Sequence, residues 1–193
     1  MDLSIESRCI HLEHDHGENR FGAISFPIYQ TATFSHPGLG ESTGYDYTRM
    51  QNPTREHLEK TVAALEKGCD CMAFSSGMAA ITTVMELFKP GDHLIADADL
   101  YGGTIRLFDH ISQKSGIEIT YVNCSRDDVK ACIRENTKAV FIETPTNPMM
   151  NVTDIEALAE ITKENHLLLI VDNTFLSPYL QNPLTLGADI VVH

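Results

Sequence analysis

The sequence lacks several features that define large classes of protein. No apolar run reaches the ~18–20 residues that a membrane-spanning helix needs. The opening stretch Met1–Cys9 mixes charges with few apolar residues, unlike a secretory signal peptide, so we expect neither a membrane anchor nor secretion. Positive charge is also scarce, because 14 Lys and Arg face 27 Asp and Glu, which gives a net charge of −13. This balance argues against nucleic acid or an anionic membrane as the main partner.

Paired cysteines and a complete set of metal ligands are missing as well. The chain has five cysteines, Cys9, Cys69, Cys71, Cys124 and Cys132. Their number is odd and none forms a Cys-x-x-Cys pair, so we interpret them as reduced thiols of a cytoplasmic protein. Three histidines have a spacing suited to metal ligands, His11, His14 and His16. No fourth ligand accompanies them, and no metal site is predicted.

What the chain does contain is a regular alternation of helix and strand patterns from about residue 55 onward. Helices are predicted over Pro53–Glu66, Gly77–Phe88, Thr104–Lys114, Asp127–Glu135 and from a capping box, Thr153-x-x-Glu156. Strands are predicted over Cys71–Phe74, His93–Ala98, Glu118–Val122, Ala139–Glu143, Leu167–Asp172 and Asp189–Val192. This order indicates βαβ units, and therefore an α/β fold whose mostly parallel sheet carries helices on both faces.

The first fifty residues differ from the rest. They carry few helix signals, several Gly and Pro, and six aromatic side chains. An arm of this kind either wraps its own domain or reaches a neighbouring subunit. We therefore divide the chain into an extended arm, residues 1–50, and an α/β domain, residues 51–193.

The most informative residue is the acid that ends the Leu167–Asn173 stretch. Five apolar residues precede Asp172 and indicate a strand buried on both faces. The carboxyl end of such a strand is where open α/β sheets bind ligands. A buried carboxylate is costly unless a cation meets it, so we expect Asp172 to face a positively charged partner.

Ser75–Ala80 joins a predicted strand to a predicted helix. Its small residues let a ligand approach the backbone, and free N–H groups at a helix start favour an anion. The stretch is neither a Walker loop nor a dinucleotide fingerprint, because both glycine patterns are absent. A plain helix start and a phosphate site remain equally compatible with these residues.

Two further loops leave strands at the same edge. Asp99–Thr104 presents Tyr101, whose ring can stack on an aromatic ligand or pack on its own helix. Glu143–Pro148 presents Asn147, which either hydrogen-bonds a ligand or holds the turn. A phosphorylated aromatic molecule with a basic ring nitrogen fits all these groups together. Pyridoxal 5'-phosphate is such a molecule, and an aspartate keeps its ring nitrogen protonated.

Seven short motifs occur in order between Gly22 and His193: Tyr45–Arg49, Asn52–Arg55, Ser75–Met78, Tyr101–Thr104, Glu143–Pro148, Val171–Thr174 and Gly187–His193. Together they resemble the pyridoxal-phosphate enzymes of cysteine and methionine metabolism, which include cystathionine γ-synthase, cystathionine γ- and β-lyases, methionine γ-lyase and homoserine sulfhydrylases. The resemblance implies an aspartate-aminotransferase-like fold, that of the large domain of fold-type-I enzymes.

The resemblance also implies roles for individual residues. Cofactor-binding residues would be Tyr47, Arg49, Ser76, Gly77, Met78, Tyr101, Asn147, Asp172 and Thr174. Gly77 and Met78 would hold the phosphate through backbone N–H groups. Tyr47 and Arg49 would reach the phosphate of a neighbouring subunit, which implies a homodimer or homotetramer that shares its active sites. Tyr101 and Asp172 would be the catalytic pair, the first near proton transfer and the second on the ring nitrogen.

Arg106 bears on the substrate. In relatives that handle cystathionine or a succinylated homoserine, an arginine at this position resembles the group that meets the distal carboxylate; the alternative is a solvated helix residue. Gly103 departs from methionine γ-lyase, which has a cysteine there, and Asp46 slightly favours a synthase. The resemblance thus favours replacement of the γ-substituent of an O-acylhomoserine by cysteine, with elimination by a γ- or β-lyase as the alternative.

The lysine that this chemistry needs, to form a Schiff base and to move protons, is not recognisable. The seven lysines are Lys60, Lys67, Lys89, Lys114, Lys130, Lys138 and Lys163, and each is predicted on a helix, at a helix end or at a strand start. In the family a Ser-x-Thr-Lys motif follows the last strand. We therefore expect an α/β domain incomplete at its C-terminus and inactive alone. A non-catalytic fragment and an unrelated nucleotide-binding domain are the competing interpretations.

Overall fold

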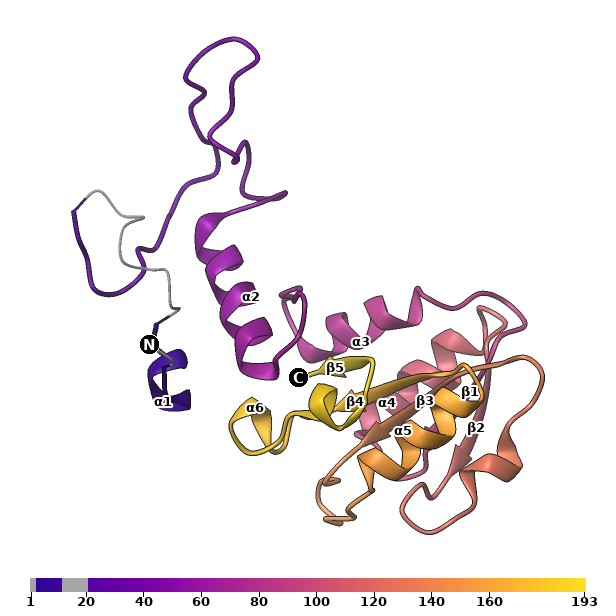
Figure 1. Ribbon diagram of the computed structural model, residues 1–193. Coiled ribbons are helices and arrows are strands. Elements are labelled where there is room, and N and C mark those ends of the chain that lie inside the picture. Colours follow the sequence, from indigo (N-terminus) through magenta and orange to yellow (C-terminus); the bar gives the residue numbers. More distant parts are fainter. Residues whose placement is uncertain (1–2, 12–20) are drawn as a thin grey trace. The chain divides into compact units, whose positions relative to one another are not determined.

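The computed structural model describes residues 3–11 and 21–193. The chain forms two compact units, Met1–Ala73 and Phe74–His193, and each is described by itself (Figure 1). This division reflects contacts within the chain, and the functional division at residue 50 stays a prediction. His14 and His16 lie outside the described residues. Within the described part, no helix has the length and apolar character needed to cross a membrane.

The first unit contains two helices, α1 (Ile5–Arg8) and α2 (Pro53–Glu66). The predicted bounds of α2 are confirmed. Asn52 begins this helix because its side chain accepts the Thr54 N–H at 2.8 Å, and the helix ends where Lys67 adopts a left-handed conformation. Between residues 21 and 52 the described backbone has no helix, and an isolated antiparallel bridge joins Thr33 to Tyr47.

The second unit is built on a parallel sheet of five strands in the order β2-β1-β3-β4-β5 (Figure 1). The strands are β1 (His93–Asp97), β2 (Glu118–Val122), β3 (Thr137–Glu143), β4 (Leu168–Asp172) and β5 (Ile190–Val192). The three central strands are nearly free of solvent contact. The predicted mostly parallel α/β sheet is confirmed.

Helices cover both faces of the sheet. They are α3 (Gly77–Met85), α4 (Gly102–Leu107), α5 (Ile155–Glu164) and α6 (Ser177–Leu180), with a π-helical turn over Phe108–Ser112 and 3-10 turns over Val129–Cys132 and Pro183–Leu186. One core joins α5 to the face of the sheet that carries Ile142 and Leu169. The other joins α3 and α4 to the opposite face, where Phe108 and Phe141 meet edge to face. Helices on both faces are thus confirmed (Figure 1).

Three local predictions are wrong. Cys71–Phe74 is not a strand, because the Ala73 N–H bonds to the Glu59 carboxylate at 2.9 Å instead of a neighbouring strand. The predicted helix over Asp127–Glu135 is a single 3-10 turn. Helix α5 begins one residue later than predicted, since the N-cap is Asp154, which accepts the Ala157 N–H, rather than Thr153.

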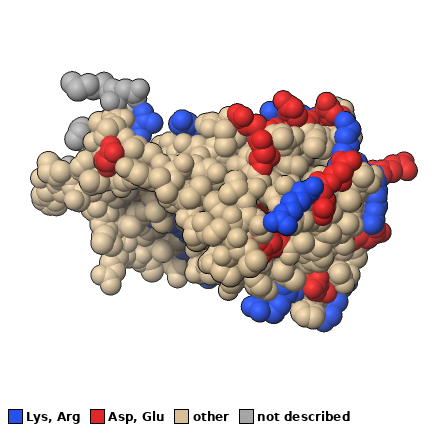
Figure 2. Space-filling view, turned by 90° about the horizontal axis from the view of Figure 1, so that it is seen from below, with Lys and Arg blue, Asp and Glu red and all other residues tan. Residues whose placement is uncertain are grey.

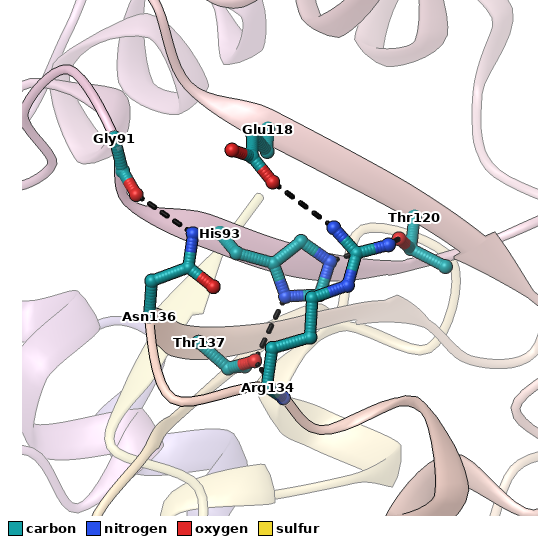
Figure 3. Close-up of polar contacts among 7 residues, drawn as sticks. All are labelled: Gly91, His93, Glu118, Thr120, Arg134, Asn136 and Thr137. Carbon is teal, nitrogen blue, oxygen red and sulfur yellow. Dashed lines mark hydrogen bonds and ion pairs between the residues drawn. The ribbon is translucent and has the colours of Figure 1, made fainter.

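At the amino-terminal ends of the strands lies a closed polar network (Figure 3). His93 has no exposed surface, and its two ring nitrogens each lie 2.8 Å from a threonine hydroxyl, of Thr120 and Thr137. Arg134 donates to both hydroxyls, through its guanidinium and its backbone N–H, and pairs with Glu118 at 3.0 Å. Burial, with help from Arg134, lowers the pKa of His93 and so favours the neutral form of the ring.

The surface also bears on partners. On the face seen in Figure 2, Lys and Arg side chains are interspersed with Asp and Glu, without a continuous patch of one sign. At the carboxyl ends of the strands, β1, β3 and β4 end in the buried acids Asp97, Glu143 and Asp172.

Candidate functional site

A cavity of about 440 Å³ lies at the carboxyl edge of the sheet. It is lined by Ser76, Gly77, Met78, Ile81, Tyr101, Glu143, Asn147, Asp172, Thr174, Phe175 and His193. Seven residues singled out from the sequence are among these: Ser76, Gly77, Met78, Tyr101, Asn147, Asp172 and Thr174. They lie at the start of α3, at the end of β4 and in the loops that follow β1, β3 and β4. These residues come together because the carboxyl ends of parallel strands lie at the same edge of the sheet.

The start of α3 forms one wall. The Ser76 hydroxyl caps the helix by accepting the Ala79 N–H at 3.1 Å. In the described part of the chain, no acceptor meets the N–H groups of Gly77 and Met78, which line the cavity. The helix dipole adds partial positive charge at this end. The wall is therefore suited to an anionic group such as phosphate.

Asp172, the last residue of β4, forms another part of the cavity lining. Its side chain is only 7 % exposed, yet it lines the cavity. The carboxylate oxygen Oδ1 accepts two hydrogen bonds from Thr174, at 3.0 Å from the backbone N–H and 2.6 Å from the hydroxyl. Among the described residues, no hydrogen-bond donor meets Oδ2 and no Lys or Arg pairs with the carboxylate. Thr174 thus fixes the orientation of an acid whose second oxygen is available to a ligand.

Tyr101 stands at the mouth of the cavity, with 55 % of its surface exposed. Its ring lies against Gly103, where a Cβ atom would come within 2.3 Å of Tyr101 Cε1 and 3.0 Å of Met78 Sδ. Glycine at this position therefore gives the ring its place beside the start of α3. An exposed aromatic face at a cavity mouth is suited to stacking on a planar ligand.

The loop that carries Asn147 is fixed by hydrogen bonds to Asp99, in the loop after β1. Asp99 Oδ2 accepts hydrogen bonds from the Thr146 hydroxyl at 2.6 Å and from Asn151 Nδ2 at 2.7 Å. These contacts join the loop after β1 to the loop after β3. No partner for the Asn147 side chain occurs among the described residues, so its amide is available to a ligand.

Four predicted residues do not line this cavity. Arg106 is exposed on α4, and its Nη1 would lie 3.8 Å from a Cβ atom at Gly102. Tyr47 and Arg49 are in the first unit, where the guanidinium lies 5.0 Å from the ring centroid. Asp46, also in that unit, pairs with an exposed histidine, His36, at 3.2 Å. Their proposed roles concern a substrate or a second subunit and stay predictions.

Sequence reasoning missed Glu143. This acid is 7 % exposed, lines the cavity and lies directly across from Asp172 in the β3–β4 register. Burial is the main cause that raises the pKa of Glu143, and the nearby Asp172 and Asp99 raise it further, against the effect of two backbone hydrogen bonds. The signal was present in the sequence, because Glu143 ends a buried strand just as Asp172 does.

The sequence from residue 6 to residue 193 matches the model of the Cys/Met metabolism PLP-dependent enzymes. The chain belongs to this family. It is 57 % identical over 173 residues to a cystathionine gamma-synthase/O-acetylhomoserine (thiol)-lyase of Bacillus subtilis (89 % of this chain, 46 % of the relative). It is 54 % identical over 178 residues to a cystathionine gamma-lyase of the same organism (92 % and 47 %).

A solved structure agrees with these relatives. The crystal structure of metB from Corynebacterium glutamicum superimposes with a TM-score of 0.92 at 46 % identity, covering 98 % of this chain and 50 % of that one. The fold is therefore that of the PLP-dependent cystathionine enzymes of fold type I. The chain spans about half the length of the curated relatives that it matches.

The family uses pyridoxal 5'-phosphate, and the cavity fits this cofactor. Two unpaired N–H groups at a helix start suit its phosphate, and a buried carboxylate with a free oxygen suits a protonated ring nitrogen. Thr174 holds that carboxylate from the side opposite the free oxygen. A tyrosine ring at the mouth supplies a flat apolar surface.

Proposed function

We propose that this chain forms the cofactor-binding part of a transsulfuration enzyme that exchanges the γ-substituent of an O-acylhomoserine for cysteine. The observation that carries the proposal is the uncompensated carboxylate of Asp172 in the same cavity as the unpaired N–H groups of α3. One end of this cavity favours a cation and the other an anion. A phosphorylated pyridinium carries both charges.

Each residue has a defined task in this proposal. Gly77 and Met78 bind the phosphate through backbone N–H groups, and the Ser76 hydroxyl assists them. Asp172 holds a proton on the ring nitrogen, Tyr101 packs against the ring, and Asn147 donates to the ring hydroxyl. The chemistry that the bound cofactor supplies is delocalisation of the electron pair left when an amino acid loses its Cα proton. Tyr101 is also placed to move a proton at the mouth of the cavity.

Tyr47 and Arg49 are assigned to a neighbouring subunit's phosphate. The contact between the guanidinium and the Tyr47 ring leaves the forked N–H donors of Arg49 free to bind phosphate oxygens bidentately. We therefore propose a homodimer, or a homotetramer of two such dimers, whose active sites are completed by the arm of the partner.

The choice between replacement and elimination depends on the substrate's distal end. Arg106 has no ion-pair partner among the described residues and projects from α4 beside Gly102. It is thus available for a distal carboxylate, which cystathionine and a succinylated homoserine both carry. Asp46 favours the synthase. A γ- or β-lyase is the second candidate, because a lyase of Bacillus subtilis is almost as similar to this chain as the synthase is.

No lysine belongs to the cavity lining, although all seven lysines are in the described part of the chain. We propose that the 193 residues alone bind the cofactor non-covalently and turn over no substrate. A non-catalytic fragment is the corresponding alternative for the chain in isolation.

Binding of pyridoxine 5'-phosphate by titration calorimetry tests the cofactor site. This analogue has no aldehyde and cannot react with surface lysines. Asp172→Asn removes a charge-assisted contact worth about 1.5–3 kcal/mol, so affinity falls by roughly 10- to 100-fold. Asp154→Asn, an exposed cap of α5, is the matched control and leaves affinity unchanged. Equal binding by the Asp172 variant would contradict the proposal.

Activity assays on a chain that also contains the family's lysine distinguish the two candidate reactions. A synthase forms cystathionine from an O-acylhomoserine and cysteine, whereas a lyase releases a ketoacid from cystathionine. Arg106→Leu should raise KM for the substrate with a distal carboxylate and leave an O-acetylhomoserine substrate unaffected.

A further inference from the structure

Glu143 interacts with the backbone of two residues whose side chains are assigned to the cofactor ring. Its Oε2 accepts the backbone N–H of Tyr101 at 2.7 Å. The backbone N–H of Asn147 also lies near this carboxylate, where it acts to lower the pKa of Glu143. Tyr101 follows β1 and Asn147 follows β3, so one side chain joins the two loops at the points where they present a ring and an amide to the cavity.

A carboxylate is suited to this task in a way that an amide is not. Ionised, it only accepts hydrogen bonds and offers about four lone-pair positions, so two peptide N–H groups can be satisfied at once. A glutamine of the same size would turn an NH2 donor toward one of the two N–H groups. Because Glu143 is 7 % exposed, water cannot easily replace a lost acceptor.

A second acid reinforces the same connection from outside the cavity. Asp99 accepts from Thr146 and Asn151 and so joins the two loops again. Unlike Asp99, Glu143 lines the cavity itself and stands opposite Asp172 on the neighbouring strand. Glu143 therefore connects both loops and also contributes a carboxylate to the lining of the cavity.

We infer that Glu143 is a positioning residue, which through one carboxylate fixes the peptides of Tyr101 and Asn147 so that ring and amide meet the cofactor together. The inference rests on the proposed cofactor site and adds a residue to it. The charged groups that face Glu143 are Asp172 on β4 and Asp99 in the loop after β1. Their mutual repulsion is relieved when a cationic ring nitrogen reaches Asp172, so Glu143 also favours the charged ring.

The amide proton signals of Tyr101 and Asn147, measured by NMR on the 193-residue chain without any ligand, test the two contacts directly. A carboxylate acceptor shifts an amide proton downfield, and this shift disappears when the carboxylate is protonated. Both signals should therefore move with one shared midpoint as pH is lowered from 8, and that midpoint should lie above the ordinary value of a glutamate. In Glu143→Gln both signals should lie upfield at pH 8 and cease to titrate.

A second measurement concerns the ring. Bound pyridoxine 5'-phosphate should acquire an induced circular dichroism band from its contact with Tyr101. Glu143→Gln should lower the band at saturation and weaken binding by about 3- to 10-fold, the effect of one lost hydrogen bond. Glu118→Gln makes the same chemical change at the opposite edge of the sheet and should alter neither the band nor the two amide signals.

The outcomes separate this inference from the proposed function. Separate midpoints for the two amides, or titration that persists in Glu143→Gln, would overturn the inference. An unchanged dichroism band and affinity in a folded Glu143→Gln would also overturn it, while leaving the cofactor site intact. Absence of any binding to the wild-type chain would instead overturn the proposed function. If Glu143→Gln does not fold, the titration of the wild-type signals still decides.

Discussion

Replacing His93 by leucine should produce a loss of stability that depends on pH with a defined sign. His93 has no exposed surface and bridges Thr120 and Thr137 across three strands (Figure 3). A neutral imidazole can do this, since one ring nitrogen donates and the other accepts. Burial and Arg134 lower the pKa of the folded ring, so protonation favours the unfolded chain.

The magnitude follows from the contacts. At pH 7.5 His93→Leu loses two neutral hydrogen bonds of about 0.5–1.5 kcal/mol each, or about 1–3 kcal/mol in total. Arg134 still donates to both threonine oxygens, but the hydroxyl that donates to the ring loses its acceptor, so the cost lies toward the upper end of this range. At pH 5.5 an unfolded histidine with a pKa of about 6.5 gains at most about 1.4 kcal/mol by protonation. This gain of the unfolded state lowers the free energy of unfolding of the wild type, but not that of the variant, which has no histidine at position 93.

Stability of the wild type should therefore fall as pH drops below about 6.5, and the leucine variant should lack that part of the fall. Urea unfolding followed by circular dichroism at pH 7.5 and 5.5 measures both. The difference between the two proteins should shrink by up to about 1.4 kcal/mol at the lower pH. His110→Leu, at an exposed position, is the control and should keep the pH dependence of the wild type. A His93→Leu cost that is equal at both pH values, or larger at pH 5.5, would refute the reasoning.

Two other substitutions test the packing on which the site depends. Gly103→Ala introduces a Cβ atom 2.3 Å from the Tyr101 ring, so the ring must move; affinity for pyridoxine 5'-phosphate should drop several-fold in calorimetry, with the far-UV circular dichroism spectrum retained. Unaltered affinity there would show that the ring position is not critical. Phe141→Ala, in a side chain with no exposed surface, should cost about 3–5 kcal/mol in urea unfolding, whereas Leu180→Ala at an exposed position should cost far less.

The fold could be predicted largely because local and long-range signals agree. Apolar runs bounded by polar turns mark β2 with its observed bounds, and Asn52 with Pro53 marks the start of α2. The errors have two causes. At Ala73 a contact with a distant residue overrides the local pattern, because its N–H bonds to Glu59. At α5 two neighbouring residues can both cap the helix, and Asp154 rather than Thr153 does so. Neither choice is visible in propensity alone.

The candidate site could be predicted only for residues that strand ends and loop composition indicate. Asp172, Tyr101 and Asn147 follow strands and were found in this way. Glu143 was passed over because its task depends on two backbone N–H groups that come from separate loops. Such a convergence is set by sheet register, which places Glu143 opposite Asp172. A sequence shows that two acids end strands, but not that these strands are neighbours.

The two edges of the sheet show how this fold separates stability from function. At the amino edge, His93 bonds to the hydroxyls of Thr120 and Thr137, and Arg134 bonds to both threonines and to Glu118, so the polar groups of this network already have partners. At the carboxyl edge, Glu143 and Asp172 lie on adjacent strands, about 5 Å apart in a parallel sheet, with no Lys or Arg paired to either among the described residues. Like charges on neighbouring strands oppose folding, and the start of α3, with its unpaired N–H groups, lines the same cavity. A molecule that brings a cation to these acids while its anion binds the start of α3 would relieve this repulsion, as the proposed cofactor does.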